Sequence, residues 1–479
     1  MGDFPPDKSD VNRRVTVVFG TLLAAGIVLR VASSVLSQGF ICPDEHQQYL
    51  EVAQGIVYGP HISWWEYERG TRHYFFPSCL ALLLYSLELV GIRDPIYQAT
   101  IIRAFLAIAI FLCLALLSRD WLRHGRTSGA LCLLTLAAMS PDIIYMSIRT
   151  LSETAATIPL LLSIYFFKRD PFLTGLLLGI MFAVRFQMAF FIPGFFALSL
   201  SDDWFARQWR KGSSWRLTAG LAISLLAAGL MDKVTWGRWF HSPLACFQAN
   251  IIEGIAAKFW VNPWYQYLVW GAELLAESMP LVGFISIVLG ILRERRWAFV
   301  GLLFLIGHSV IAHKDQRFLW PLAPIGLLVV ASGFEMVYRR ISARWGRLIF
   351  VSVCSFCLAA GSWLRLEHLN WVPEPSRSSS LALAKIGRYP DVTGVAVFHL
   401  PTVECGNYFY LRRDVPLLVK DTTDPSAITS HPLWVQGTIN YLIARPKDMG
   451  GFVKYPLEEV IVIHGLGIYK VKAEQAASR

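Results

Sequence analysis

The stretch Ile41-Cys42-Pro43-Asp44-Glu45-His46-Gln47-Gln48-Tyr49 follows the first long apolar run of the chain, Val15–Leu36. That run holds about 22 residues, enough to cross the roughly 30 Å hydrocarbon core of a bilayer as a helix. Pro43 favours a turn out of this helix, because the residue before a proline is pushed away from helical geometry. Two adjacent carboxylates, Asp44 and Glu45, therefore stand where the chain leaves the membrane and open an amphipathic helix.

Adjacent carboxylates repel each other unless one is neutralised by a partner or is put to use. Their structural explanation is a helix N-terminus, where acidic side chains interact favourably with the helix dipole. Their functional explanation is catalysis. The rest of the chain favours catalysis.

The composition indicates a membrane protein with many spans. Hydrophobic residues make up 54% of the chain, charged residues only 16%, and there are 17 tryptophans, which is typical of polytopic membrane proteins. The net charge of +10 does not indicate nucleic-acid binding, because the basic residues form short clusters between apolar runs, as cytoplasmic loops do. We expect an uncleaved first span and no disulfide framework among the 8 cysteines.

The positive-inside rule gives one orientation for nearly all of the basic clusters. With a cytoplasmic N-terminus, Asp44 emerges on the outer or luminal side, and segment 74–92 fits only as an interfacial or re-entrant helix. About eleven spans are expected: 15–36, 99–118, 129–147, 151–167, 172–185, 187–201, 216–231, 266–292, 297–312, 318–337 and 347–363. The cytoplasmic basic clusters then lie at 119–126, 168–169, 207–216, 293–296 and 339–347.

The character of the chain changes after residue 364. The following residues are polar, with short strand-like runs at 392–400, 433–444 and 460–471. The sequence therefore predicts a transmembrane domain at 1–364, whose outer or luminal loop with interfacial helices covers 37–98, and a small α/β domain at 365–479. An odd number of spans places that domain on the same side as Asp44.

Several ionisable residues fall on the outer side in this topology, where basic side chains need an anionic partner. Arginine binds phosphate as a bidentate fork and lysine as a point charge, so a lipid phosphate is one candidate partner and the Asp44-Glu45 pair is another. Taken alone, Arg103 and Arg185 favour snorkelling to the interface. Aromatic residues on this side fit an interfacial belt or the lining of a sugar site.

Separated motifs resemble glycosyltransferase family 22 of the C-type superfamily, which holds the lipid-phosphate-mannose-dependent α-mannosyltransferases of N-glycan and glycosylphosphatidylinositol (GPI) assembly. In family order they are Pro43-Asp44-Glu45, Trp64-Trp65-Glu66-Tyr67, Arg149-Thr150-Leu151-Ser152 and His313-Lys314-Asp315-Gln316-Arg317-Phe318. Thr235-Trp236-Gly237 with Pro243, Asn250 and Glu253-Gly254 is most similar to the third mannosyltransferase of GPI-anchor assembly. The resemblance covers residues 15–325, and it departs from the family at Cys42, where a histidine is usual, and at Asp315-Gln316.

The resemblance implies the C-type glycosyltransferase fold and transfer of mannose from polyprenyl or dolichyl phosphate mannose to a lipid-linked, GPI precursor-like glycan. A single inverting step, here to an α-1,2 linkage, needs a base on the acceptor hydroxyl and stabilisation of the leaving phosphate. We assign the base to Asp44, with Glu45 supporting it or positioning the acceptor. We assign phosphate binding to His313, Lys314, Arg317 and Arg149, and the sugar path to Trp64, Trp65, Tyr67, Trp236 and His241.

We expect no metal, no cofactor other than the lipid-phosphate-mannose substrate, and no nucleic-acid partner. The surrounding lipids would belong to the endoplasmic reticulum membrane in a eukaryote, with a luminal site, or to the plasma membrane in a bacterium, with an outward-facing site. The competing function is a polytopic lipid or lipid-linked sugar transporter, which usually has inverted repeats or broken helices at the midplane. A lipid-phosphate-sugar transferase of other specificity and a non-catalytic scaffold subunit are further alternatives.

Overall fold

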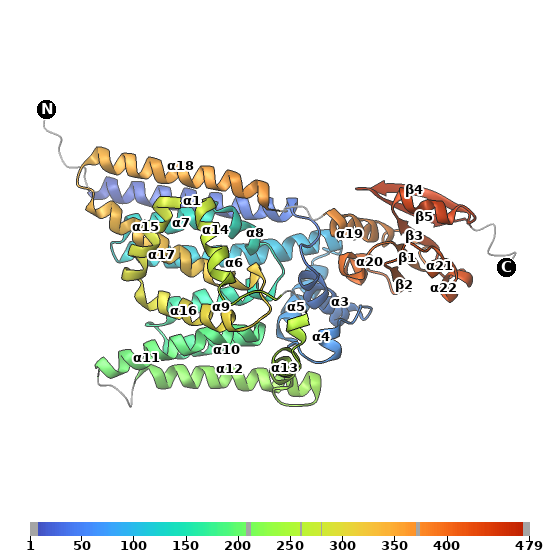
Figure 1. The fold of residues 1–479 in the computed structure, drawn as a ribbon, viewed down its shortest axis with the longest axis horizontal. Coiled ribbons are helices and arrows are strands. Elements are labelled where there is room, and N and C mark those ends of the chain that lie inside the picture. The colour runs from blue at the N-terminus through green and yellow to red at the C-terminus, as the bar shows by residue number, and fades with distance from the viewer. Residues whose placement is uncertain (1–7, 207–211, 259–260, 279, 370–373, 473–479) are drawn as a thin grey trace. The chain divides into compact units, whose positions relative to one another are not determined.

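The computed structural model describes residues 8–206, 212–258, 261–278, 280–369 and 374–472. The chain forms two compact units, and each is made of separate segments. Unit 1 comprises Met1–Ser33, Gly70–Phe75 and Ala104–Leu369, and unit 2 comprises Ser34–Arg69, Phe76–Arg103 and Asn370–Arg479. Figure 1 shows their elements, coloured along the chain.

The described part of unit 1 is made of helices and loops, with one isolated antiparallel β-bridge between Val261 and His313. Its elements, each assigned to the unit that holds most of its residues, are α1 (Lys8–Leu36), α6 (Pro95–Arg123), α7 (Thr127–Met139), α8 (Pro141–Ser147), α9 (Ser152–Phe166), α10 (Pro171–Val184), η2 (Phe186–Phe191), α11 (Ile192–Ala206), α12 (Ser213–Trp236), α13 (His241–Phe247), η3 (Gln248–Ile252), η4 (Ile255–Lys258), α14 (Gln266–Ser278), α15 (Pro280–Arg293), α16 (Arg295–Val310), η5 (Gln316–Leu319), α17 (Leu322–Arg340) and α18 (Arg344–His368).

The predicted polytopic α-helical class is confirmed, although long spans are fewer than the eleven expected. Five described helices are long and apolar enough to cross a membrane, namely parts of α1, α6, α12, α17 and α18, and the bent pair α7 and α8 makes a sixth if it is one span. Other expected spans coincide with shorter helices, such as the 14 residues of α10 and the 16 of α16. At 1.5 Å per residue, helices of this length fall short of 30 Å.

Small residues let the helices of unit 1 approach closely. A side chain on Gly175 of α10 would collide with the backbone of Leu217 in α12, and one on Gly220 would collide with Phe172. Such close backbone contact is typical of helix packing in membranes. The core of unit 1 is mainly leucine and alanine, and within it the rings of Phe191 and Phe304 stack with their centroids 4.1 Å apart.

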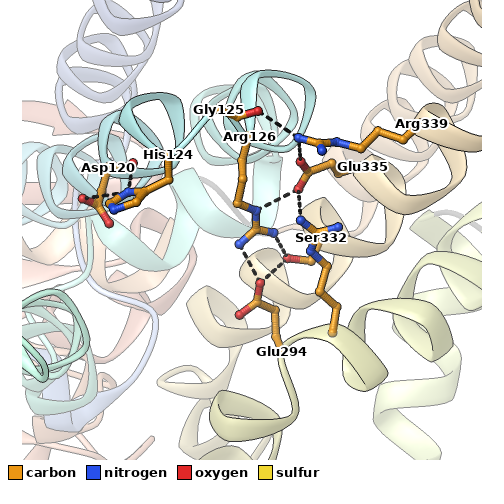
Figure 2. A network of polar contacts seen from close by, with 9 residues as sticks. Asp120, His124, Gly125, Arg126, Glu294, Ser332, Glu335 and Arg339 are labelled. Carbon is orange, nitrogen blue, oxygen red and sulfur yellow. Dashed lines mark hydrogen bonds and ion pairs between the residues drawn. The ribbon is translucent and has the colours of Figure 1, made fainter.

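Three of the five basic clusters predicted to share one side, at 119–126, 293–296 and 339–347, meet in unit 1 (Figure 2). Arg126 donates to Oε1 of Glu294 and to Oε2 of Glu335, both at 2.8 Å. Glu335 also pairs with Arg339 at 2.7 Å, and Ser332 donates to Glu294 at 2.6 Å. Residues from three predicted cytoplasmic loops therefore form one network at one end of the unit.

Unit 2 combines helices with a small sheet. Its elements are α2 (Pro43–Glu45), η1 (His46–Leu50), α3 (Glu51–Tyr58), α4 (Trp65–Glu68), α5 (Phe75–Leu89), α19 (Glu374–Ile386), β1 (Val395–Phe398), η6 (Thr402–Glu404), α20 (Asn407–Leu411), β2 (Leu417–Lys420), α21 (Ser426–Thr429), α22 (Pro432–Val435), β3 (Tyr441–Ala444), η7 (Pro446–Phe452), β4 (Leu457–Ile463) and β5 (Leu466–Val471).

The five strands have the order β2-β1-β3-β5-β4. Strand β1 pairs in parallel with β2 and β3, while β5 pairs antiparallel with β3 and β4. The predicted run 392–400 contains β1, the run 433–444 is a strand only from Tyr441, and the run 460–471 is divided between the end of β4 and β5. Strand β2 is not among the predicted runs. The boundary predicted at 364/365 falls inside α18, and unit 2 joins the sheet to the loop that carries Asp44.

Candidate active site

The Asp44-Glu45 pair lies in unit 2 on α2, which is followed by η1 and α3, so the segment is three short helical pieces rather than one continuous α-helix. Pro43 occupies the first position of α2, where its fixed backbone angle suits a helix start. Glu45 is fully buried, and its Oε2 accepts a 3.0 Å hydrogen bond from the N–H of Ile41. Asp44 is only half-buried. Glu45 therefore holds the turn, and Asp44 is the more exposed carboxylate of the two.

The piece after the acidic pair, η1, is a π-helical turn, a feature found frequently at functional sites. The apolar face predicted from the helical spacing is buried at Tyr49, Val52 and Ala53, whereas Ile56 is 47% exposed. The ring of Tyr49 packs against Phe76 with centroids 5.0 Å apart. This face anchors the segment, so the carboxylates at its start are held in place.

The predicted aromatic motif is attached to the same segment. Tyr67 is buried, and its hydroxyl donates a 2.9 Å hydrogen bond to the carbonyl oxygen of Gln48. The amide of Gln48 donates to Oε1 of Glu66 at 2.8 Å. Trp64 and Trp65 are half-buried. Within unit 2 the structure thus brings Tyr67 to the acidic segment in a positioning role, while the two tryptophans keep part of their surface exposed.

Residues from the C-terminal part of unit 2 also contact the acidic segment, and the sequence did not predict these contacts. Gln47 donates to the carbonyl of Thr402 at 3.0 Å and accepts from the amide of Asn407 at 2.8 Å. The ring of His46 stacks on Phe40 at 4.8 Å and on Tyr410 at 5.6 Å. Burial lowers the pKa of His46 to about 3, so this imidazole is neutral at ordinary pH.

The His313–Phe318 loop of unit 1 presents one buried cation. Lys314 is 3% exposed, and its ammonium donates to the carbonyls of Ile311 at 2.5 Å and Asn262 at 3.3 Å. Burial lowers the pKa of Lys314. Arg317 instead pairs with Asp315 at 2.9 Å. In the part of the chain that the structure describes, the ammonium of Lys314 is held by these two carbonyl oxygens and forms no ion pair with a carboxylate. The ring of His313 lies against Phe318, with centroids 5.4 Å apart.

Both arginines for which snorkelling was expected are buried instead. Arg103 in unit 2 is 1% exposed and donates to the carbonyl of Ser37 at 2.6 Å. Arg185 in unit 1 is 6% exposed and pairs with Glu153 at 3.1 Å. Each guanidinium group donates to an oxygen atom inside the protein, and this bond offsets the hydration that the group loses on burial. Arg149 is also buried, with its guanidinium over Tyr145 at 4.2 Å.

Buried polar atoms surround the pair of Arg185 and Glu153. Among the described residues, Oε1 of Glu153, Nε2 of His308 and Oη of Tyr267 have no hydrogen-bond partner. The ring of Tyr267 also lies 5.8 Å from the ammonium of Lys314. Buried polar atoms are normally satisfied, so this cluster suits a polar ligand. None of the three was predicted, because each is a single polar residue next to or inside an apolar run.

Trp236 and His241 form a second aromatic group in unit 1. Their ring centroids lie 5.5 Å apart, and Trp236 also packs against Tyr74 at 5.3 Å. Beside them, both carboxylate oxygens of Asp232 accept a hydrogen bond from the hydroxyl of Ser242 at 2.7 Å. The structure therefore brings Trp236 and His241 together on the turn between α12 and α13, which the Asp232–Ser242 hydrogen bonds hold. Across the described residues, no group of three histidine, cysteine or carboxylate side chains is placed to bind a metal.

Solved structures share the fold of this chain. ArnT from Cupriavidus metallidurans, in a crystal structure bound to undecaprenyl phosphate, superposes with a TM-score of 0.61 over 95% of this chain and 98% of that chain, at 12% sequence identity. This likeness confirms the predicted C-type glycosyltransferase fold.

Sequence comparison finds mannosyltransferases. GPI mannosyltransferase 3 of Trypanosoma brucei brucei is 26% identical over 367 residues, which are 65% of this chain and 63% of that protein. GPI alpha-1,2-mannosyltransferase 3 of Danio rerio is 23% identical over 355 residues, 70% of this chain and 64% of that protein. The chain thus spans somewhat less than two thirds of the length of either relative. The model of the Alg9-like mannosyltransferase family matches residues 21–373. This chain belongs to the Alg9-like mannosyltransferase family.

Proposed function

We propose that this protein transfers mannose from a polyprenyl or dolichyl phosphate mannose to a lipid-linked glycan that resembles a GPI precursor, forming an α-1,2 linkage with inversion. Family membership supports mannose transfer. The name of the Danio rerio relative supports the linkage, and the undecaprenyl phosphate bound by ArnT supports a polyprenyl phosphate carrier.

The buried ammonium of Lys314 carries the proposal. A buried cation without a carboxylate partner is costly unless a ligand neutralises it. The donor phosphate has the required charge, and it gains a second negative charge when the sugar leaves. Lys314 therefore stabilises the transition state more than the ground state, which is the requirement for catalysis. The proposal gives Arg317, His313 and Arg149 supporting roles at the same phosphate.

Asp44 provides the base in this proposal. Its carboxylate removes the proton of the acceptor hydroxyl as the hydroxyl oxygen attacks the anomeric carbon of mannose. The bond from that carbon to the phosphate oxygen breaks, and its electron pair remains on the departing lipid phosphate. Because the phosphate leaves as an anion, the step needs no strong acid, and no metal is part of the proposal. Trp64 and Trp65 provide flat faces for the sugar.

The test is transfer of radiolabelled mannose from purified dolichyl phosphate mannose to a panel of lipid-linked glycans by the purified full chain. We expect transfer to a GPI-like acceptor that persists in EDTA. Lys314→Ala is expected to lower kcat by on the order of 10²–10³, as loss of one oxyanion contact does, while Lys314→Arg retains part of it. Lys233→Ala, which removes an exposed lysine that donates to the carbonyl of Gly237, is the matched control.

The transporter alternative predicts a different result. If no acceptor were mannosylated and the donor lipid instead crossed vesicles that contain the protein, the proposed function would be wrong. Equal rates for Lys314→Ala and wild type would leave mannose transfer in place but remove Lys314 from the phosphate site.

A further inference from the structure

A cavity of about 630 Å³ lies in unit 1. None of its lining residues is assigned above to the candidate active site. Its walls come from α6, from the end of α9 and the turn that follows it, and from α16 and α17. Leu117, Ile164 and Leu328 lie behind its wall and are almost fully buried, so the apolar surface comes mainly from half-buried aromatic residues, and charged residues supply the remainder. The cavity therefore offers an apolar and an ionic surface together.

The ionic part of the cavity is positive. Four basic residues line it, Arg123, Lys168, Arg169 and Arg296, against one carboxylate, Asp120. Asp120 already pairs with Arg169, and the last basic residue, Arg296, pairs with Asp202 at 2.6 Å. Arg123 and Lys168 are exposed, and neither has an ion-pair partner among the described residues. Two charges are thus left for an anion from outside the protein.

The cavity also has aromatic walls. Trp121, Tyr165 and Trp297 line it, and Tyr165 lies under the guanidinium of Arg169 at 4.0 Å. Tryptophan and tyrosine beside basic residues are typical of the level of lipid head groups. Arg123 is the last residue of α6, which is long and apolar enough to cross a membrane. The cavity therefore opens where a spanning helix ends.

We propose that this cavity binds an anionic phospholipid, with the head-group phosphate at Arg123 and Lys168 and the start of an acyl chain against the apolar faces of Trp121, Tyr165 and Trp297. Arginine and lysine are the side chains that recognise phosphate. A soluble phosphate would leave the apolar wall unused, whereas a lipid fills both parts. The network of Arg126, Glu294 and Glu335 at the same end (Figure 2) ties α7 and α17 to the turn before α16 and so keeps the wall in place.

Native mass spectrometry of the purified full chain, titrated with phosphatidylglycerol, tests the proposal. The double variant Arg123→Ala with Lys168→Ala is expected to bind phosphatidylglycerol on the order of 10-fold more weakly, since each basic residue near an anionic lipid surface contributes to the attraction. The control is Arg340→Ala with Arg344→Ala, which removes the same charge from exposed residues outside the cavity. Circular dichroism melting checks that both variants fold.

Two further titrations identify the source of the phosphate. We expect phosphatidylcholine to bind the wild type weakly and inorganic phosphate at millimolar concentration to leave bound phosphatidylglycerol in place. Displacement by inorganic phosphate would show that the cavity takes a soluble anion and would overturn the lipid assignment. Equal affinity of the cavity variant and the control variant for phosphatidylglycerol would overturn the site itself. A single Lys168→Glu variant, with reversed charge, is expected to weaken binding further than Lys168→Ala.

Discussion

The backbone N–H of Phe409 donates a 2.9 Å hydrogen bond to Oε2 of Glu51, a residue 358 positions earlier in the chain. Oε1 of the same carboxylate accepts from the N–H of Tyr408 at 3.1 Å and from that of Ile62 at 3.0 Å. Glu51 is fully buried. A single side chain thus attaches α3, which continues the segment bearing Asp44, to the start of α20 in the same unit.

Replacing Glu51 by glutamine is expected to destabilise the protein by about 1–3 kcal/mol, the cost of leaving a buried polar group without its partner. Both carboxylate oxygens accept from N–H groups, and a glutamine would place its own N–H₂ against at least one of these donors. Thermal unfolding of the detergent-purified chain measures the effect. Glu68→Gln, on an exposed residue of α4, is the control and is expected to leave the melting temperature unchanged.

The pH dependence of stability should report the same carboxyl group. Burial raises the pKa of Glu51 from 4.5 to about 7, although three N–H donors and Arg412 act in the opposite direction. A raised carboxyl pKa means that the folded state holds the proton longer than the unfolded state. The contribution of Glu51 is therefore present in full below pH 4.5 and is lost as the pH rises to about 7, by at most about 1.4 kcal/mol per pH unit.

His46 lies 3.6 Å from Glu51 and changes stability in the opposite sense. Burial lowers its pKa from 6.5 to about 3, so its contribution is lost as the pH falls below 6.5. Between pH 4.5 and 6.5, Glu51 lowers the unfolding free energy as the pH rises, whereas His46 raises it. A variant without the Glu51 carboxyl group separates the two contributions. We expect the difference in unfolding free energy between wild type and Glu51→Gln to shrink from pH 5 to pH 8. A difference that stayed constant across this range would contradict the raised pKa.

The sequence predicts those parts of the fold that composition decides. Apolar runs predict α6, α17 and α18 close to where they lie. Charges that are unusual in a membrane protein single out Asp44 and Lys314, and their roles stay predictions. The breaks inside apolar runs were not predictable, because apolar composition alone does not show where a helix ends. The expected span 266–292 is therefore two helices, α14 and α15.

Other features depend on pairing in space rather than on spacing along the chain. Glu51 has no sequence neighbour that indicates its contact with Phe409, and Glu153 has none that indicates Arg185, since both pairs form through tertiary packing. The short strand β2 is recognisable only beside β1, with which it pairs. His308 is a single polar residue in an apolar helix. This pattern is as typical of a histidine in the core as of one in a functional site.

Gly175→Ala is expected to destabilise unit 1 by about 1–3 kcal/mol, the usual effect of overpacking. Its new methyl group would meet the carbonyl oxygen of Leu217, which is backbone and cannot move aside as a side chain can. Gly326→Ala is the matched control, because nothing lies within 4 Å of that position in α17 and alanine favours a helix over glycine. A melting temperature for Gly175→Ala equal to that of the control would mean that α10 and α12 are less closely packed than described.

Separate substitutions in the acidic pair should divide catalysis from positioning. Asp44→Asn keeps the shape of the residue and removes the base, so kcat for mannose transfer is expected to fall by about 10²–10⁴ with KM little changed. Glu45→Gln keeps an oxygen that can accept from the N–H of Ile41 but loses its charge, so it should retain more activity and show a higher KM if Glu45 positions the acceptor. Asp421→Asn, on an exposed aspartate of unit 2, is the control. If Glu45→Gln removed activity while Asp44→Asn kept a near-normal kcat, Glu45 would be the base and Asp44 the positioning residue. The Ile41–Glu45 turn would then have to move, since Glu45 is buried in this structure and could not otherwise reach the acceptor.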